Sequence, residues 1–283
     1  MQFDFPTIMV VAVLLTGVIW GLDVWLWAPK RRLQLKENSG GESATSEQDN
    51  NELKDQRHYR EPVIVEYSRS LFPVILIVLL LRSFLVEPFR IPSGSMMPTL
   101  LDGDFILVNK YTYGIRLPVI NSKILSIGSP KRGDVAVFRY PVNPKIDFIK
   151  RVIGLPGDHI QYHDNTLYVN GNPIEQADNG VYDATGAGIS MAGAELLEEN
   201  LTGVKHKILK VNGQPSQYMQ YADYTVGEHE YFMMGDNRDN SNDSRFWGPV
   251  PEANLVGRAF MIWMNWDSTN GGVTWSRIGT SIR

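Results

Sequence analysis

The chain has 283 residues, a formal net charge of −4 and no cysteine. A mildly acidic chain lacks the basic face that nucleic acid binding requires, so we expect no nucleic acid partner. The absence of cysteine excludes disulfides, thiolate metal sites and cysteine nucleophiles. The length is sufficient for one sizeable domain with accessory segments.

The first long apolar segment, residues 5–27, has the length of a transmembrane helix. At about 1.5 Å per residue it crosses a hydrocarbon core about 30 Å thick. Lys30, Arg31 and Arg32 follow it, and no basic residue precedes it, which places the N-terminus outside and the following residues in the cytoplasm. The segment lacks the basic start and the small-residue cleavage site of a signal peptide. We therefore interpret residues 1–29 as an uncleaved anchor.

Asp23 is the one ionisable residue in this segment, and we expect it to be hydrated at the cytoplasmic interface. Residues 30–67 are interpreted as a largely disordered cytoplasmic loop, because residues 34–57 are polar, charged and poor in large apolar groups.

A second apolar stretch, residues 71–81, is short for a membrane span and is also consistent with a core helix. It extends over residues 68–86 if Arg82 reaches the far interface along its aliphatic stem. The favoured interpretation is a second transmembrane helix over residues 68–87. Residues 88–283 then lie outside the cytoplasm.

After Pro88, short runs of β-branched and aromatic residues alternate with turn formers. No long amphipathic helix separates these runs, which argues against a parallel α/β sheet and favours a mainly β fold with antiparallel sheets. Residues 172–225 are less regular, so we expect residues 159–228 to form a small inserted subdomain. Asn170-Gly171 predicts a hairpin turn. The strongest strand candidates are Phe105–Val108, Asp134–Phe138, Asp147–Ile153, Thr166–Val169, Tyr231–Met234 and Ala259–Trp263.

Two histidines, His159 and His163, have the HxxxH spacing that binds zinc when it lies on a helix. The segment has the pattern of a strand and turn, and a strand separates the two rings by roughly 13 Å. No Glu follows His159, so we expect no metal site.

Ser93 and Ser95 lie in a turn that glycine and two prolines restrict, within Pro92–Pro98. Hydroxyl-rich turns are commonly turns and nothing more. The surrounding apolar residues nevertheless suggest a surface that meets lipid or an apolar substrate. These residues are Phe89, Ile91, Met96, Met97 and Leu100.

The predicted strand over residues 147–153 carries two adjacent cations. Alternation places Lys150 on one face with Phe148 and Val152, and Arg151 on the other face. Taken alone, the lysine is best explained as protection of an edge strand. The alternative is a desolvated lysine whose pKa falls, so that its neutral amine accepts a proton.

A third polar segment, residues 235–245, concentrates turn formers, carboxylates and hydroxyls after an apolar strand. Its carboxylates could bind calcium, but the spacing does not match an EF-hand loop and two arginines oppose them. A self-satisfied network of Arg–Asp and Ser–backbone bonds is the better interpretation.

Taken together and in this order, these segments closely resemble the bacterial type I signal peptidases, or leader peptidases, a family of serine peptidases with a Ser–Lys dyad. The resemblance implies an all-β catalytic domain after two transmembrane helices, on the periplasmic face of the bacterial inner membrane. It also implies that preproteins carrying signal peptides are the substrates, that the lipid bilayer is a partner and that no cofactor is needed. The matching segments are FRIPSGSMMPTL (89–100), GDFILVNKYTYG (103–114), KRGDVAVFRYP (131–141), DFIKRVIGLPGD (147–158), YFMMGDNRDNSNDSR (231–245) and WGPVPEANLVGRA (247–259).

By this resemblance, Ser95 matches the nucleophile and Lys150 the general base. Ser93 matches the hydroxyl that assists the oxyanion hole beside the backbone N–H of Ser95, and Ser241 the hydroxyl that orients the lysine amine. Phe148 stands where a tyrosine is expected, and the stretch between residues 158 and 228 is shorter and lacks a cysteine pair. The two small specificity pockets match Phe89, Ile91, Met96, Leu100, Ile106, Val137, Phe148 and Ile149.

Two other functions remain open from the residues. A Ser–Lys protease could instead cleave its own chain, as soluble repressor-type autoproteases do, although two membrane spans argue against this. A membrane-tethered β-domain could also act as a scaffold or ion-binding module, with the acidic segment 235–245 as its site.

Overall fold

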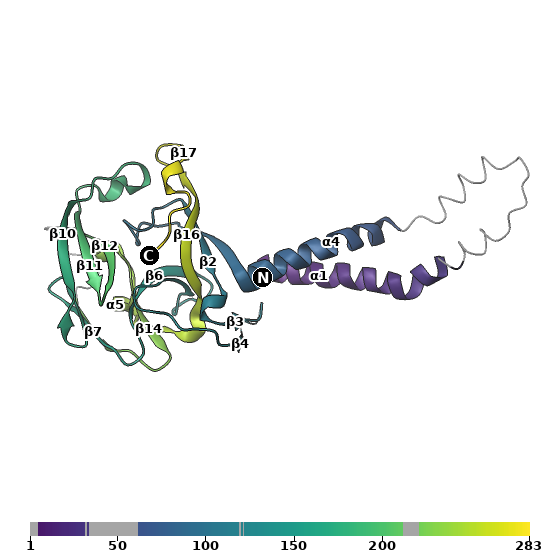
Figure 1. The fold of residues 1–283 in the computed structure, drawn as a ribbon, viewed down its shortest axis with the longest axis horizontal. Coiled ribbons are helices and arrows are strands. Elements are labelled where there is room, and N and C mark those ends of the chain that lie inside the picture. Colours follow the sequence, from purple (N-terminus) through teal and green to yellow (C-terminus); the bar gives the residue numbers. More distant parts are fainter. Residues whose placement is uncertain (1–4, 32, 34–61, 119, 121, 212–220) are drawn as a thin grey trace, which may run out of the picture. The chain divides into compact units, whose positions relative to one another are not determined.

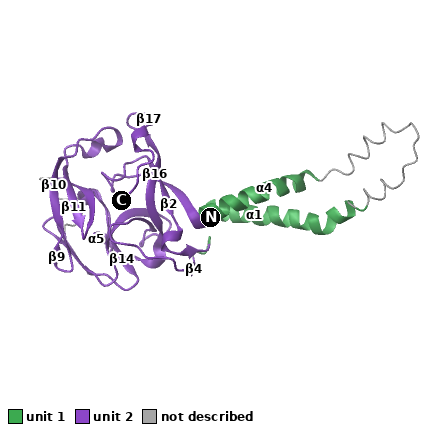
Figure 2. Ribbon diagram, in the orientation of Figure 1, with its two compact units in different colours: residues 1–83, 118–120 green, residues 84–117, 121–283 purple. Residues whose placement is uncertain are grey.

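The computed structural model describes residues 5–31, 33, 62–118, 120, 122–211 and 221–283. The chain divides into two units, one formed by Met1–Ser83 with Pro118–Ile120 and the other by Phe84–Leu117 with Asn121–Arg283 (Figure 2). Figure 1 shows that the first unit holds the long helices and the second holds the sheets. The expected cytoplasmic loop at 34–57 lies outside the described residues.

The first unit contains helix α1 (Phe5–Leu22), which continues through a π-helical turn (Asp23–Trp27), and helix α4 (Val63–Leu80), which continues through a second π-helical turn (Leu81–Leu85). The two helical segments, Phe5–Arg31 and Val63–Leu85, are long and apolar enough to cross a membrane. Most of their side chains are exposed, as expected for lipid-facing helices and not for the core helix of a soluble domain.

Helix α4 begins at Val63, before the expected start at Ser68. The carbonyl of Pro62 accepts hydrogen bonds from the backbone N–H groups of Val65 (2.8 Å) and Glu66 (3.1 Å), so the chain is already helical there. The helix therefore includes polar residues that hydropathy alone assigns to the preceding loop. Its helical segment ends at Leu85, two residues before the expected end, because Val86 and Glu87 begin strand β1.

Helices α1 and α4 pack through Phe72, whose ring lies 5.5 Å from that of Trp20. A Cβ atom on Gly17 would lie 2.8 Å from the Phe72 ring, so this glycine permits the approach. Asp23 is 3% exposed and accepts two hydrogen bonds of 2.6 Å from the guanidinium of Arg31. The expectation that water satisfies this carboxylate is wrong, because an arginine two turns further along the helix pairs with it.

The second unit is built from antiparallel strand pairs, as predicted. Its largest described sheet has eight strands in the order β1-β2-β16-β5-β6-β14-β15, with β17 beside β16. Every predicted strand outside the insertion belongs to this sheet. The bounds are β1 Val86–Arg90, β2 Asp104–Asn109, β5 Val135–Arg139, β6 Asp147–Gly154, β14 Glu230–Met234, β15 Val250–Pro251, β16 Leu255–Asp267 and β17 Gly272–Val273.

Between β6 and β14 the chain leaves this sheet and forms two others, in the orders β13-β7-β8-β9 and β10-β11-β12. The insertion is thus more regular than predicted. The Asn170-Gly171 turn is confirmed, since both residues have positive φ (53° and 77°) between β8 and β9. The bounds are β7 His159–His163, β8 Thr166–Val169, β9 Asn172–Pro173, β10 Glu175–Val181, β11 Glu195–Leu201, β12 Val204–Lys210 and β13 Ala222–Thr225.

The remaining described elements are short. They are the strand pair β3 Ile115–Arg116 and β4 Lys123–Leu125, helix α5 Ser244–Trp247, and 3₁₀ turns at Tyr111–Tyr113, Gly186–Met191, Arg238–Asn240, Glu252–Asn254 and Trp275–Arg277.

Candidate active site

Ser95 lies in the turn that joins β1 to β2. The turn is closed at its base, where Ile91 N–H donates to the Asp104 carbonyl (2.8 Å) and Gly103 N–H donates to the Ile91 carbonyl (3.0 Å). Inside it, Met97 N–H donates to the Gly94 carbonyl (3.1 Å). The two ends of the turn are thus fixed by strand pairing, and Ser95 is half-buried at its centre.

Lys150 extends from β6 and meets this turn. Its Nζ atom is hydrogen-bonded to Ser95 Oγ, so the structure brings together the two residues predicted as nucleophile and base. Lys150 is only 4% exposed, and its Nζ lies 5.6 Å from the centre of the Phe148 ring. The expected apolar flank on the same strand face is therefore present.

Burial lowers the pKa of Lys150 from 10.5 to about 8. The carboxylates of Asp243 and Asp236 act in the opposite direction and Arg245 adds to the lowering, but desolvation is the largest effect. At pH 7 about a tenth of the amines are neutral, roughly 300 times the fraction for an ordinary lysine. The amine can therefore accept a proton near neutral pH.

The other two predicted hydroxyls lie at the same place with different surroundings. Ser93 is exposed, and its Oγ lies 3.5 Å from Ser95 Oγ. Ser241 is fully buried, and among the described residues its Oγ makes no hydrogen bond to Lys150; its hydroxyl instead contributes to lowering the pKa of the Asp243 carboxyl. A Cβ atom on Gly235 would lie 2.3 Å from Ser241 Oγ and 2.4 Å from the Ser95 carbonyl, so Ser241 and Ser95 both pack against this glycine. The orienting role of Ser241 stays a prediction.

Asn237 contacts the Ser95 turn directly, and the sequence analysis did not single it out. Its backbone N–H donates to the Ser95 carbonyl (3.2 Å), and its Nδ2 donates to the Gly94 carbonyl (3.0 Å). It is 1% exposed. The only sequence signal was its position in a segment dense in turn formers, which does not reveal a tertiary contact.

The apolar residues predicted to line the specificity pockets, apart from Phe148, belong to one cluster under the Ser95 turn. Phe89 is partly buried, and the others form closely packed core. Phe148 belongs to a separate aromatic group, where it stacks on Tyr140 at 4.4 Å and packs edge-on against Trp247. The structure thus places these side chains beside Ser95 and Lys150, and their contact with substrate stays a prediction.

The 235–245 segment, called here the acidic loop, contains the predicted Arg–Asp pair, but it is not self-satisfied as predicted, because Asp236 binds Arg151 and Arg238 binds Glu199, both outside the segment. Asp243 accepts from Arg245 Nε (2.8 Å) and from the Gly235 backbone N–H (3.0 Å), and Ser244 Oγ accepts from Met233 N–H (2.9 Å). Burial works against ionisation of Asp243, but Arg245 outweighs it and lowers the pKa of that carboxyl. Arg245 and the loop backbone therefore occupy the Asp243 oxygens that a cation would need.

The two histidines of the HxxxH segment have separate partners on the surface of β7. His159 Nε2 lies 2.7 Å from Asp223 Oδ1, whereas His163 stacks on Tyr168 with ring centres 4.4 Å apart.

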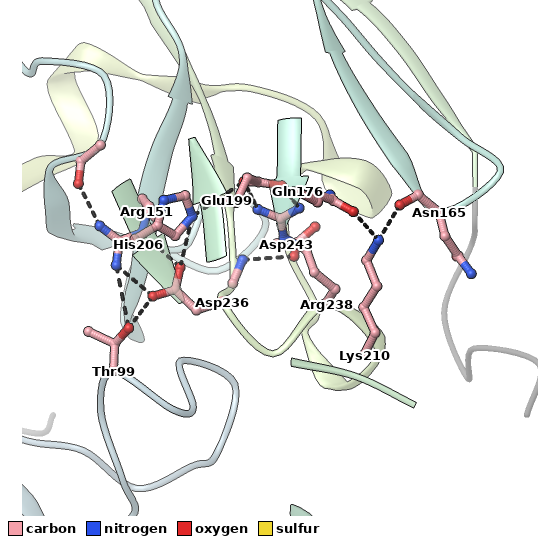
Figure 3. Close-up of polar contacts among 12 residues, drawn as sticks. Thr99, Arg151, Asn165, Gln176, Glu199, His206, Lys210, Asp236, Arg238 and Asp243 are labelled. Atoms are coloured by element: carbon pink, nitrogen blue, oxygen red, sulfur yellow. Dashed lines mark hydrogen bonds and ion pairs between the residues drawn. The ribbon is translucent and has the colours of Figure 1, made fainter. Parts of the chain in front are cut away.

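Arg151, next to Lys150 on β6, contacts the acidic loop on the other face of the strand. It donates to both carboxylate oxygens of Asp236, from Nε (2.8 Å) and Nη2 (2.6 Å). Thr99 Oγ1 donates to the same carboxylate (2.5 Å), as Figure 3 shows. The strand that carries Lys150, the turn that carries Ser95 and the acidic loop are therefore tied together by buried polar contacts.

The fold and the site define a class of protein. An antiparallel β domain follows two helices long enough to cross a membrane, and it holds a serine hydroxyl against a buried amine of lowered pKa. This is the arrangement that a serine hydrolase needs when lysine replaces histidine as the base.

Residues 64–266 match the family model described as signal peptidase, peptidase S26, and the chain belongs to this family. A protein named Signal peptidase I from Pseudomonas fluorescens is 47% identical over 279 residues, covering 94% of each chain. The Signal peptidase I of Pseudomonas aeruginosa is 47% identical with the same coverage, and that of Haemophilus influenzae is 35% identical over 92% of this chain and 86% of its own. A crystal structure of a signal peptidase I from Enterococcus faecalis is 28% identical over 47% of this chain and 98% of its own, with a TM-score of 0.28.

Proposed function

We propose that this chain is a membrane-bound serine endopeptidase that removes N-terminal signal peptides from exported preproteins by cleavage after a small residue. Family membership and relatives named Signal peptidase I, matched over most of both chains, support the reaction. The observation that carries the mechanism is the hydrogen bond between Lys150 Nζ and Ser95 Oγ in a buried setting.

In the proposed reaction, Ser95 Oγ attacks the scissile carbonyl carbon while Lys150 takes its proton. The tetrahedral intermediate then collapses, the peptide bond breaks, and Lys150 gives the proton to the leaving amine. Water, deprotonated by the same lysine, attacks the ester carbonyl. The ester bond to Ser95 then breaks, the signal peptide is released, and Lys150 returns the proton to Ser95 Oγ. Proton transfer of this kind contributes roughly 10²–10⁴-fold to the rate.

Ser93 and the backbone N–H of Ser95 are proposed to stabilise the oxyanion. The Ser93 hydroxyl is exposed and 3.5 Å from the nucleophile, which leaves it free to turn toward a substrate oxygen. An oxyanion donor contributes roughly 10²–10³-fold, so Ser93→Ala should lower kcat by about that factor and leave measurable activity. Ser241, buried behind Gly235, is proposed to orient the lysine amine.

The proposed specificity comes from the apolar cluster beside the turn. Because its members are closely packed, we expect only small side chains near the scissile bond to fit, which matches the A-x-A-like pattern of signal peptide cleavage sites. The contact residues are those predicted from the sequence: Phe89, Ile91, Met96, Leu100, Ile106, Val137, Phe148 and Ile149.

We further propose a location in the bacterial inner membrane, with the lipid bilayer as a partner and no nucleic acid partner. Basic residues follow the first span and none precedes it, which favours an N-terminus outside and the intervening residues in the cytoplasm. A second span returns the chain, so that the β domain lies on the periplasmic face, where exported preproteins emerge.

The test is processing of a model preprotein by purified full-length protein in detergent, with the new N-terminus mapped. Wild type should cut after a small residue, and Ser95→Ala and Lys150→Met should each abolish this. Lys145→Met, at an exposed lysine just before β6, is the matched control and should cleave normally. Full activity in either active-site variant contradicts the dyad, and cleavage of its own chain as the only reaction supports the self-processing alternative.

A further inference from the structure

The inserted sheet β10-β11-β12 meets the acidic loop along its backbone. Leu209 N–H, on β12, donates to the Asp236 carbonyl (2.9 Å), and Leu209 forms an isolated parallel bridge with Asn237. One residue past β12, Val211 N–H donates to Asp239 Oδ2 (2.8 Å). The insertion therefore contacts the part of the loop that contacts the Ser95 turn.

A buried ion pair reinforces this junction. Glu199, on the inward face of β11, binds the guanidinium of Arg238 with both oxygens, including a 2.7 Å bond from Nη1 to Oε1. Both side chains are fully buried. Burial works against ionisation of Glu199, but Arg238 outweighs it and holds the pKa of this carboxyl well below its usual range. A charge at a core position of a strand is costly without such a partner.

Further contacts fix the Glu199 carboxylate in one orientation (Figure 3). Gln176 Nε2, on β10, donates to Oε1 (2.9 Å), and Gln176 Oε1 accepts from Lys210 Nζ (2.6 Å). His206 Nε2, on β12, lies 3.3 Å from Glu199 Oε2 and 4.0 Å from Asp236 Oδ1. Each strand of the β10-β11-β12 sheet thus contributes a side chain to the group that holds Arg238.

The position of Arg238 reaches the nucleophile through its neighbour in the chain. Asn237 donates two hydrogen bonds to the turn, to the carbonyls of Gly94 and Ser95. On the other side, the Arg238 carbonyl accepts from Arg245 Nη2 (2.6 Å). A displacement of Arg238 therefore moves Asn237, and Asn237 sets where the backbone of Ser95 lies relative to Lys150.

We propose that Glu199 is a positioning residue: through its buried pair with Arg238, the insertion holds Asn237 against the Ser95 turn and so aligns Ser95 Oγ with Lys150 Nζ. This inference rests on the proposed function of that serine and lysine, and it gives the insertion a role that its sequence does not suggest. Glu199 contacts no substrate atom and acts only through the loop.

The experiment compares Glu199→Gln with wild type as full-length protein in detergent, measuring kcat, KM and the pH dependence of kcat for preprotein cleavage. Misalignment of a reacting pair costs roughly 10- to 100-fold, so we expect kcat to fall by that factor while KM stays within about twofold. The acid limb of the profile should move to higher pH, because a loosened turn admits water to the Lys150 amine.

Two controls separate positioning from general destabilisation. Glu198→Gln changes the adjacent glutamate of β11, which forms an exposed pair with Lys205 (2.9 Å), and it should leave all readouts unchanged. Leu167→Ala removes a fully buried apolar side chain of β8 that belongs to the core of the insertion. This variant should have a lower Tm than wild type. At temperatures where it is folded, its kcat and the acid limb of its pH profile should equal those of wild type.

Glu199→Gln leaves Arg238 buried without its counter-ion. If this variant does not fold, Glu199→Gln/Arg238→Gln, which removes both charges, decides the question. A folded double variant with lowered kcat and a shifted limb supports the inference. Wild-type kcat in either folded variant overturns the inference. It is also overturned if Leu167→Ala loses as much kcat and shows the same shift of the acid limb. If wild type itself does not cleave the preprotein, both the proposed function and the inference are wrong. If wild type cleaves and substitution of Glu199 leaves kcat unchanged, only the inference is wrong.

Discussion

Lys150 and Arg151 are neighbours on β6, and both are buried and basic. They lie on opposite faces of the strand, however, and different groups surround them. Lys150 faces Phe148 and the Ser95 hydroxyl, and burial lowers its pKa to about 8. Arg151 faces Asp236, which binds it with both oxygens. The two faces therefore differ in the partner that they give the buried cation: a hydroxyl and an aromatic ring for Lys150, and a carboxylate for Arg151.

The largest expected effect is on the Lys150 face. Lys150→Met should lower kcat by roughly 10²–10⁴-fold or more, because no other described group at the site can take the Ser95 proton. Its stability should stay level or rise, because a partly charged amine is replaced by an apolar side chain of similar length in an apolar setting. Cleavage kinetics and urea unfolding of the same preparation check both parts; lost stability with retained kcat would reverse the assignment of the two faces.

Arg151→Met should have the opposite profile and mainly affect stability. It leaves the fully buried Asp236 carboxylate without its counter-ion, which costs on the order of 3–5 kcal/mol of unfolding free energy. Thr99 Oγ1 would remain as one donor to that carboxylate. Denaturant unfolding measures the loss, and Asp236→Asn/Arg151→Met should recover part of it. An unchanged midpoint in the single variant would mean that the pair contributes nothing.

The pH dependence of kcat should follow the Lys150 amine. Because the active form is the neutral amine and the pKa is about 8, kcat should fall about tenfold per pH unit well below that value, or roughly 50-fold between pH 8 and pH 6. The same shift makes stability rise with pH between about 8 and 10.5, where the unfolded chain binds a proton that the folded chain has released. A rate that is level down to pH 5 contradicts a lysine that must be neutral to act.

The smallest effect is expected from Phe148→Ala, which removes the ring 5.6 Å from Lys150 Nζ. Water reaching the amine should raise its pKa and move the acid limb of kcat upward by a fraction of a pH unit to about one unit. Tyr140→Ala, which removes the ring stacked on Phe148, is the matched control and should move the limb less. Equal shifts of the acid limb in the two variants would contradict a specific effect of the Phe148 ring on the Lys150 amine.

The two faces of β6 also illustrate which features of the site could be predicted from the sequence. Alternation along β6 was sufficient to separate Lys150 from Arg151, and the motif resemblance identified Ser95, so the pair could be predicted before its geometry was known. The strands of the large sheet were recognisable because their apolar runs are bounded by turn formers. Strands β11 and β12 were missed because their inward faces carry Glu199, His206 and Lys210, which hide the apolar alternation, and β10 was missed because its side chains are almost all exposed.

What could not be predicted depends on contacts between distant segments. Asn237 is one of many turn-forming residues until its two hydrogen bonds to the Ser95 turn are seen. The partner of Asp23 was missed for a related reason, since hydropathy does not show that Arg31 folds back along the helix to reach it. Local patterns therefore predicted which elements form, whereas the polar contacts that align the site required the tertiary structure.

The most direct test of the central claim is a titration of the Lys150 amine in the folded protein. Carbon-13 NMR of full-length protein labelled at the lysine ε-carbon, with the Lys150 signal assigned by its absence in Lys150→Met, gives this pKa without reference to turnover. We expect a midpoint near pH 8 for Lys150. A midpoint for Lys150 at the ordinary value of 10.5 would contradict the account, because the amine would then be too rarely neutral to serve as the base.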